Sequence, residues 1–196
     1  MRAIAAISRN GVIGRGNVIP WRIRDELAWF RSQTLGGVVV MGRRTFESLP
    51  KPLGGRLTVV LTSDPARLLA DDVFRARCGD ALAGMADHEA QDAAPWSLPG
   101  PPRTEVRVSR GIEALLQAPI TERAWLCGGA AVYAQFLGRC TELLLSVVDR
   151  EVEGDVLFPP FEHLFDLSGV AAEFPAFRVL RYVRNPARSG SGGRSL

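Results

Sequence analysis

The sequence predicts an α/β domain with a mostly parallel central sheet, flanking helices and antiparallel strands at its C-terminal edge. Short apolar runs bounded by turn residues recur along the chain and alternate with helical patterns. Strands of a parallel sheet are covered on both faces, so they lose the polar alternation of half-exposed strands. The last third of the chain differs, because its apolar stretches are longer. The alternation indicates an α/β domain.

The individual elements follow from these patterns. The expected parallel strands are residues 3–7, 38–41, 57–61 and 124–127, and the expected helices are 25–34, 45–49, 112–117 and 130–137. Residues 142–159 and 177–185 are interpreted as longer strands, the second antiparallel at one edge of the sheet. Residues 84–104 are rich in Ala and Pro and have no period, which predicts an inserted surface loop. Residues 188–196, RSGSGGRSL, predict a flexible tail.

Composition and charge favour one globular domain and exclude several other classes. The 196 residues are 46% apolar and 23% charged, with a formal net charge of +3. Because no run of five basic residues occurs, a nucleic-acid partner is not expected. The first apolar segment is too short for a signal peptide or a membrane span. We therefore expect a cytoplasmic protein with no membrane partner.

The cysteines and histidines do not form a recognisable metal or disulfide pattern. Cys78, Cys127 and Cys140 form no CxxC pair, and an odd, sparse cysteine count fits a reducing compartment. His88 and His163 are far apart in the chain and lack ligand spacing. We expect neither a disulfide scaffold nor a metal site.

One acidic residue, Glu26, falls within the apolar stripe of the first predicted helix. At about 100° per residue, Phe30 lies roughly 40° and Trp29 roughly 60° from Glu26 around the helix axis. A buried carboxylate is costly unless it has a partner. Glu26 either lies at the edge of the stripe beside an arginine, or stands in an apolar pocket. In a pocket its pKa would rise, and it would accept two parallel N–H donors from a ligand.

Three strand ends carry groups suited to phosphates. Ligands of open α/β sheets bind at the carboxyl ends of the strands, and paired glycines let the backbone approach a ligand closely. The groups are Arg43, Arg44 and Thr45 after the second strand, Thr62 and Ser63 after the third, and Gly128 and Gly129 after the fourth. Together they predict a nucleotide cofactor with several phosphates.

An ordered set of motifs resembles the dihydrofolate reductase family. The motifs are AAIS, GVIGRGNVIPWRIRDELAWF, VVVMGRRTFESLPKPLGGR, VVLTS, CGGAAVYAQFL and VEGDVLFP. The resemblance implies reduction of 7,8-dihydrofolate to 5,6,7,8-tetrahydrofolate, with hydride transfer from NADPH to C6 and protonation at N5. It further implies a role in one-carbon metabolism, binding of antifolate inhibitors and a monomeric enzyme. The family domain would span residues 1–187, with an adenosine-side subdomain at about 36–120 that carries the inserted loop.

The resemblance assigns a substrate site. Glu26 matches the single acid of the pterin pocket, and Ser146, Trp21 and Ile19 match the rest of the reaction centre. Arg56 matches the arginine that holds the α-carboxylate of the glutamate tail, a task that suits a bidentate guanidinium. The residues that match the walls of the pterin and aminobenzoate site are Ile4, Ala5, Leu27, Phe30, Leu49, Cys127 and Tyr133.

The resemblance also assigns an NADPH site. Arg43 and Ser63 are the candidates for the 2′-phosphate, and Asp155 matches an acid that hydrogen-bonds the loop at residues 14–19. The Gly128-Gly129 peptide bond is expected to be cis. The full set of cofactor positions is Ala6, Ile13, Asn17, Ile19, Gly42, Arg43, Arg44, Thr45, Leu61, Thr62, Ser63, Cys127, Gly128, Gly129, Ala130, Ala131, Val132 and Tyr133.

Several positions depart from the family pattern, and two other functions stay open. Ser146 replaces a usual threonine, Ala130 a third glycine, and Ala131 a frequent arginine. The segment after residue 160 is short, which predicts trimmed final strands. A riboflavin-pathway reductase would share the sheet and the glycine turn, but it is not expected to carry the PWxxxxE motif. A catalytically inactive nucleotide-binding protein would break Glu26 or the glycine pair, and both are intact.

Overall fold

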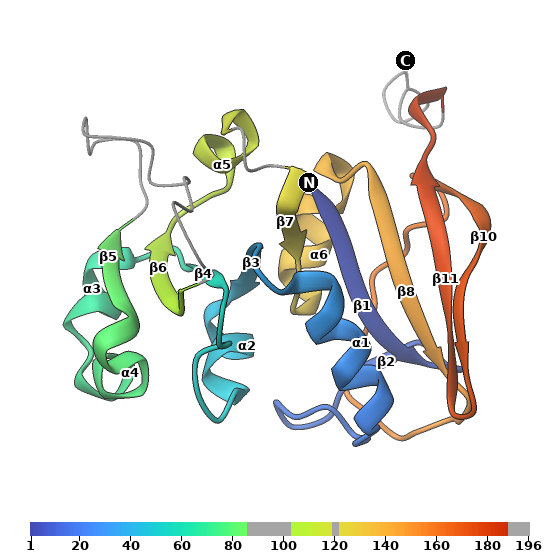
Figure 1. Cartoon of the computed structure of the whole chain (residues 1–196), viewed down its shortest axis with the longest axis horizontal. Helices are drawn as coiled ribbons and strands as arrows, with labels where there is room; N and C mark the ends of the chain where they lie inside the picture. The colour runs from blue at the N-terminus through green and yellow to red at the C-terminus, as the bar shows by residue number, and fades with distance from the viewer. Residues whose placement is uncertain (86–102, 119–121, 188–196) are drawn as a thin grey trace, which may run out of the picture.

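A computed structural model of the chain describes residues 1–85, 103–118 and 122–187 (Figure 1). Within these residues, one sheet of nine strands runs in the order β10-β11-β8-β1-β7-β3-β4-β6-β5, and β2 pairs with β9 in a small second sheet. The strands are β1 (Arg2–Ser8), β2 (Val12–Gly14), β3 (Val38–Gly42), β4 (Leu57–Leu61), β5 (Leu82–Met85), β6 (Glu105–Ser109), β7 (Ala124–Leu126), β8 (Glu142–Val148), β9 (Val156–Leu157), β10 (Phe165–Phe174) and β11 (Phe177–Arg184). The helices are α1 (Arg24–Thr34), α2 (Arg43–Ser48), α3 (Pro65–Ala70), α4 (Asp72–Cys78), α5 (Glu113–Gln117) and α6 (Ala130–Phe136).

The strand directions confirm the predicted fold class. The seven strands from β8 to β5 pair in parallel, and β11 is antiparallel to both β8 and β10. The predicted place of β11 at the edge is wrong, because β10 forms the edge and β11 lies between β10 and β8. The final strands, for which trimming was predicted, are the longest antiparallel pair of the sheet. β10 has 10 residues and β11 has 8, and only Pro175 and Ala176 separate them. The C-terminal segment therefore has a tight turn between two long strands.

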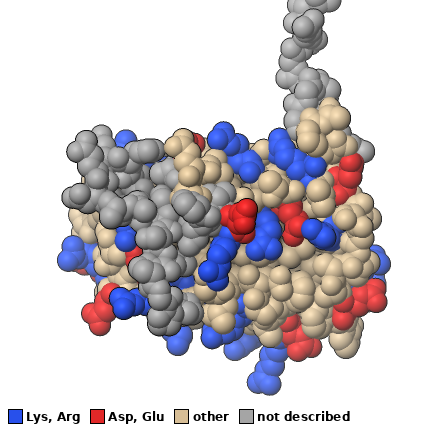
Figure 2. Space-filling model, turned by 45° about the horizontal axis from the view of Figure 1, so that its top comes forward, with Lys and Arg blue, Asp and Glu red and all other residues tan. Residues whose placement is uncertain are grey.

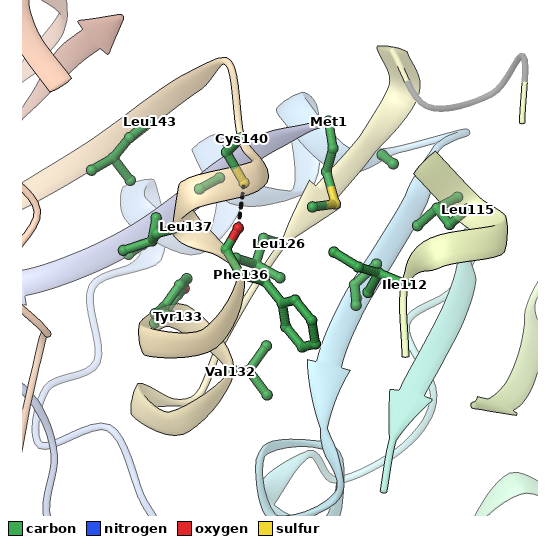
Figure 3. Packing of buried hydrophobic residues seen from close by; sticks show 14 of the residues in the cluster. Met1, Ile112, Leu115, Leu126, Val132, Tyr133, Phe136, Leu137, Cys140 and Leu143 are labelled. Atoms are coloured by element: carbon green, nitrogen blue, oxygen red, sulfur yellow. Dashed lines mark hydrogen bonds between the residues drawn. The ribbon is translucent and has the colours of Figure 1, made fainter. Parts of the chain in front are cut away.

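One face of the sheet packs against α5 and α6. Alternate residues of β1, such as Ala3 and Ala5, point into this core. Residues of β3 and β4 on the same face of the sheet point into it as well. Figure 3 shows Val132, Tyr133 and Phe136 of α6 facing this core, with Ile112, directly before α5, and Leu115 of α5 beside them. The side chains are tightly enclosed, and burial of such apolar side chains contributes roughly 1.5–3 kcal/mol each.

The opposite face is divided into two apolar clusters. One surrounds Phe46 of α2 and Phe74 of α4, and the other surrounds Trp21 and Trp125 and includes the apolar side of α1. Cys127, directly after β7, packs against both clusters. The carboxyl ends of the central strands therefore lie where the two clusters meet, which is where a ligand of an open α/β sheet binds.

Several elements escaped the sequence analysis. α3 and α4 lie within a stretch for which no element was expected, and each begins at an aspartate side chain that accepts a backbone N–H bond. Asp64 Oδ1 accepts from Arg67 N at 3.0 Å, and Asp71 Oδ1 accepts from Phe74 N at 2.8 Å. Of the predicted loop at 84–104, residues 86–102 lie outside the described residues, and residues 84 and 85 belong to β5. The predicted tail at 188–196 also lies outside them.

The surface agrees with the small net charge. On the face shown in Figure 2, basic and acidic side chains are interspersed. No helix in the described part of the chain is long and apolar enough to cross a membrane.

Candidate active site

Glu26 is a buried carboxyl group in the first turn of α1. Only 7% of the residue is exposed, and its carboxyl group forms no hydrogen bond or ion pair with any residue that the structure describes. Burial raises the pKa of the Glu26 carboxyl from 4.5 to about 7. The alternative of an acid at the helix edge paired with arginine is therefore wrong. The structure shows an acid kept in an apolar setting.

Two further buried polar atoms lie on the same face of the sheet as Glu26. Ser146 is completely buried, and its register partner on β1 is Ala6. Its Oγ and the Nε1 of Trp21 form no hydrogen bond with the described residues. Buried polar atoms in native proteins have partners, so unpaired ones point to a ligand or an ordered water. Glu26, Ser146 and Trp21 thus offer one acidic, one hydroxyl and one N–H group for such partners.

Apolar side chains line the surroundings of these three groups. Ile4 is 2% exposed and packs with Trp21, and Phe30 is partly buried against the same cluster. Ala5 points to the other face of the sheet, into the core around α6. Leu27 is half-exposed at the outer side of α1, so it is not part of the buried stripe. Leu49 packs in the neighbouring cluster around Phe46.

Arg56 is a buried cation without an acidic partner among the described residues. The residue is only 4% exposed, and it lies directly after the turn that precedes β4. Its Nη1 donates to Thr34 Oγ1 at 3.0 Å, its Nε donates to Gly54 O at 3.3 Å, and its guanidinium lies 5.9 Å from the Phe30 ring. Burial, with the nearby Arg31 charge, lowers the pKa of Arg56. A guanidinium has five N–H donors, so several remain to bind a carboxylate.

The sequence analysis did not find the contribution of Thr34. Thr34 is fully buried at the end of α1, and its hydroxyl also donates to Phe30 O at 2.8 Å. The hydroxyl therefore links the last turn of α1 to the Arg56 side chain. The available signal was that a polar residue occupies a stripe position two turns after Glu26.

The glycine turn after β7 brings three elements together. The Gly128-Gly129 peptide bond is cis, as expected. Gly128 has a φ of +100°, and a Cβ there would lie 2.8 Å from Tyr133 Cε2. Its carbonyl oxygen accepts a hydrogen bond from Gly42 N at 2.7 Å, which ties the end of β3 to the start of α6. A side chain at position 128 is thus excluded both by conformation and by space.

Tyr133 and Cys127 shape this turn from within. The Tyr133 hydroxyl donates to Ile4 O at 2.6 Å, so the phenol is already paired. Burial raises the pKa of the Cys127 thiol, and its backbone N–H donates to Val40 O at 2.7 Å. Both residues support the site through packing, since neither offers a charged group.

The predicted phosphate groups gather at neighbouring strand ends. Gly42 pairs with Leu61 across β3 and β4, so the residues that follow them lie side by side. Arg44 and Ser63 are exposed there, and Thr62 N donates to Ser109 O at 3.0 Å. A Cβ on Gly129 would lie 3.1 Å from Thr45 Oγ1, so Thr45 lies against the glycine turn.

Further cofactor positions lie at the start of α6 and in β2. Val132 lies 3.1 Å from the position of a Cβ on Gly42. Ala130 and Ala131 open α6, where Ala131 is exposed. Ile13 of β2 is partly buried against the main core.

The loop at residues 14–19 is held by Asp155. Gly16 N donates to Asp155 Oδ1 at 3.1 Å, and Asp155 N donates to Gly14 O at 3.2 Å. The predicted contact of Asp155 with this loop is therefore confirmed. Asn17 has a φ of 67°, and Ile19 is 55% exposed. After the polar tip, Val18 and Ile19 form an exposed apolar end of the loop.

The described residues contain no group of three or more His, Cys, Asp or Glu residues placed to hold a metal ion.

Comparison with known proteins identifies the family. The family model for dihydrofolate reductase matches residues 1–94 and 101–171. The chain is 34% identical to dihydrofolate reductase type 3 of Salmonella typhimurium over 81% of this chain and 77% of that protein. It is 36% identical to the dihydrofolate reductase of Neisseria gonorrhoeae, over 81% and 78% respectively. It is 32% identical to the dihydrofolate reductase of Mycoplasma pneumoniae, over 93% and 96%.

A solved structure supports the same fold. It is the dihydrofolate reductase from Enterococcus faecalis complexed with NADP(H) and RAB-propyl, which superimposes with a TM-score of 0.63 at 22% identity, over 94% of this chain and 95% of that one. The chain belongs to the dihydrofolate reductase family.

Proposed function

We propose that the chain reduces 7,8-dihydrofolate to 5,6,7,8-tetrahydrofolate, with hydride transfer to C6 and protonation at N5, using NADPH. The observation that carries the proposal is the buried, unpaired Glu26 within a member of this family. A single acid in an apolar pocket suits the amino-pyrimidine edge of a pterin, which presents two parallel N–H donors. Family membership gives this chemistry its substrate.

The substrate would lie between α1 and the carboxyl ends of the central strands. Glu26 accepts the two N–H bonds, and Ser146 completes the network with its unpaired hydroxyl. At the other end, Arg56 offers its unused N–H groups to the α-carboxylate of the glutamate tail. Of the apolar positions assigned to the walls of this site, Ile4, Phe30 and Cys127 lie on the same face of the sheet as Glu26.

The raised pKa of Glu26 supports the proposal that N5 is protonated in the reaction. A carboxyl with a pKa of about 7 exchanges protons readily near neutral pH. Glu26 favours protonation of N5 through an ordered water, for which Trp21 Nε1 is an available donor. We assign to Ile19, which is exposed in the loop at residues 14–19, the role of covering the reacting rings.

NADPH supplies the hydride when bound. At position 128 there is no room for a side chain, so the backbone of the glycine turn can approach the diphosphate closely. The neighbouring strand ends carry the polar and basic groups that would bind the phosphates. Arg43 and Ser63 are assigned to the 2′-phosphate, and Arg44 and Thr45 to the other phosphates. Ala6, Ile13 and Asn17 would lie beside the nicotinamide and its ribose.

The proposal extends to the oligomeric state and location of the enzyme. The enzyme acts as a monomer in the cytoplasm, and its product supplies one-carbon metabolism. Antifolates with a protonated amino-pyrimidine compete for the Glu26 carboxylate. Sedimentation at micromolar concentration tests the monomer, and a dimer under these conditions would contradict it.

A direct assay tests the reaction. Purified enzyme with NADPH is mixed with dihydrofolate, and the NADPH absorbance band is followed while tetrahydrofolate is identified by mass and retention. We expect stoichiometric loss of NADPH and formation of tetrahydrofolate. NADPH oxidation with a ribosylaminopyrimidine and none with dihydrofolate would instead support the riboflavin-pathway alternative. Binding of NADPH without turnover of either substrate would support the inactive nucleotide-binding protein.

A further inference from the structure

Arg43, the residue assigned to the 2′-phosphate, already binds an acid. Its Nη1 donates to Glu47 Oε1 at 2.7 Å and to Oε2 at 3.0 Å, four residues further along α2. Both side chains are partly exposed, 44% for Arg43 and 33% for Glu47. The side chain of the neighbouring Arg44 forms no hydrogen bond or ion pair with the described residues. The two adjacent arginines therefore differ in charge environment.

The pairing leaves part of the Arg43 guanidinium free. Only Nη1 contacts the carboxylate, so Nε and Nη2 remain as a fork that can bind a phosphate. A phosphate on this fork would share the guanidinium with Glu47. Two anions on one cation repel each other across a few ångströms.

We propose that Glu47 is a specificity-determining residue, which weakens the preference for a 2′-phosphorylated dinucleotide by sharing Arg43 with the phosphate. This inference rests on the proposed function, because it assumes that Arg43 faces the 2′-phosphate. The effect concerns NADPH alone. NADH has a hydroxyl at the same ribose carbon and places no second anion beside Glu47.

Glu47 has two opposing effects on NADPH binding, because it orders the Arg43 side chain and it repels the 2′-phosphate. The larger effect decides whether removing the charge of Glu47 weakens or tightens NADPH binding. An exposed i,i+4 ion pair orders the arginine only weakly. The phosphate carries close to two negative charges, so its repulsion from a carboxylate a few ångströms away is the larger effect at low salt. Removing the charge of Glu47 should therefore tighten NADPH binding, by about three- to tenfold at low ionic strength.

The test compares two charge-neutralising variants of the full chain. Glu47→Gln keeps the size of the side chain and an oxygen that can accept from Arg43. Glu142→Gln is the matched control, because Glu142 also pairs with an arginine, Arg181, at 2.7 Å, but lies at the start of β8. The dissociation constants of NADPH and NADH are measured by fluorescence titration at low and at high salt.

We expect Glu47→Gln to tighten NADPH binding three- to tenfold at low salt, with NADH changed less than twofold. The gain should fall below about twofold at 0.5 M salt, because exposed charges are screened there. The control variant should leave both constants within about twofold of the wild type. Thermal unfolding of each variant verifies that it is folded.

The outcomes separate this inference from the proposed function. If the wild type binds NADPH but Glu47→Gln leaves the constant unchanged or weakens it, the inference is wrong and the proposed function is unaffected. An equal gain for NADH and NADPH also overturns the inference, since it would be independent of the 2′-phosphate. A wild type that binds no NADPH overturns both.

Discussion

Replacing Glu26 with glutamine should change how the stability of the free protein depends on pH. The pKa of the Glu26 carboxyl is about 7 in the folded protein, raised by burial from its ordinary value of 4.5. Since the folded pKa is the higher one, the folded state binds the proton more tightly than the unfolded state. The stabilisation is present at acid pH and is lost as the pH rises through 7. With about 1.4 kcal/mol for each pH unit between the two pKa values, the free energy of unfolding falls by roughly 2.5 kcal/mol from pH 5 to pH 8.

Glu26→Gln removes this loss, because the amide is neutral at every pH in the range. Relative to the wild type, the variant should gain roughly 2.5 kcal/mol between pH 5 and pH 8, or about 5–10 °C in Tm. Denaturant unfolding without ligands at both pH values measures the change. Glu173→Gln is the control, because Glu173 is exposed on β10 and its neutralisation should leave the pH dependence unaltered. Parallel curves for wild type and Glu26→Gln would refute the reasoning that burial raises the pKa of Glu26.

Three further predictions concern the two binding regions. The ratio of kcat/KM for NADPH over NADH should be at least about tenfold, equal to about 1.4 kcal/mol, and equal values would contradict the phosphate assignment. Arg56→Ala and Arg56→Lys should raise the KM for dihydrofolate while leaving the dissociation constant of NADPH within about twofold, because a bidentate guanidinium is lost. If Arg56→Ala loses as much activity on a pterin that lacks the glutamate tail as it loses on dihydrofolate, the role assigned to Arg56 is wrong. Gly128→Ala should weaken NADPH binding by about tenfold or more, since its Cβ would collide with Tyr133; unchanged binding in isothermal titration would contradict a tight turn at the diphosphate.

The parallel part of the sheet was predictable because its strands are buried on both faces. The runs that became β3 and β4 consist largely of branched apolar residues, and no other element fits so short and continuous an apolar run. β6 was missed because its sequence, EVRVS, alternates and stands beside the unassigned insertion. α3 and α4 were missed as well, although Asp64 before Pro65 and Asp71 carry the ordinary signals of helix starts. The helices are short, so their apolar periodicity is weak.

The place of Glu26 within the apolar stripe followed from local helical geometry, but its burial without a partner did not. Whether an acid in the apolar stripe of a helix contacts an arginine depends on which other elements pack against that stripe. The contact between Thr34 and Arg56 joins residues 22 positions apart and likewise depends on how α1 meets the turn before β4. By contrast, the pair of Arg43 with Glu47 has i,i+4 spacing and could have been found in the sequence. Local contacts were thus within reach of sequence reasoning, whereas contacts between elements required the structure.

The most direct test of the account is the rate of hydride transfer in Glu26→Gln across pH. Single-turnover measurements with NADPH and dihydrofolate between about pH 5 and 9 isolate the chemical step for the wild type and the variant. The variant should be slower by on the order of 10²-fold or more near pH 7, the usual scale for a positioned acid–base group. The deficit should shrink toward pH 5, where protonated dihydrofolate reacts without help from the carboxyl. A variant that keeps the wild-type rate near pH 7, or a deficit that is the same at every pH, would contradict the assignment of Glu26 as the acid of the site.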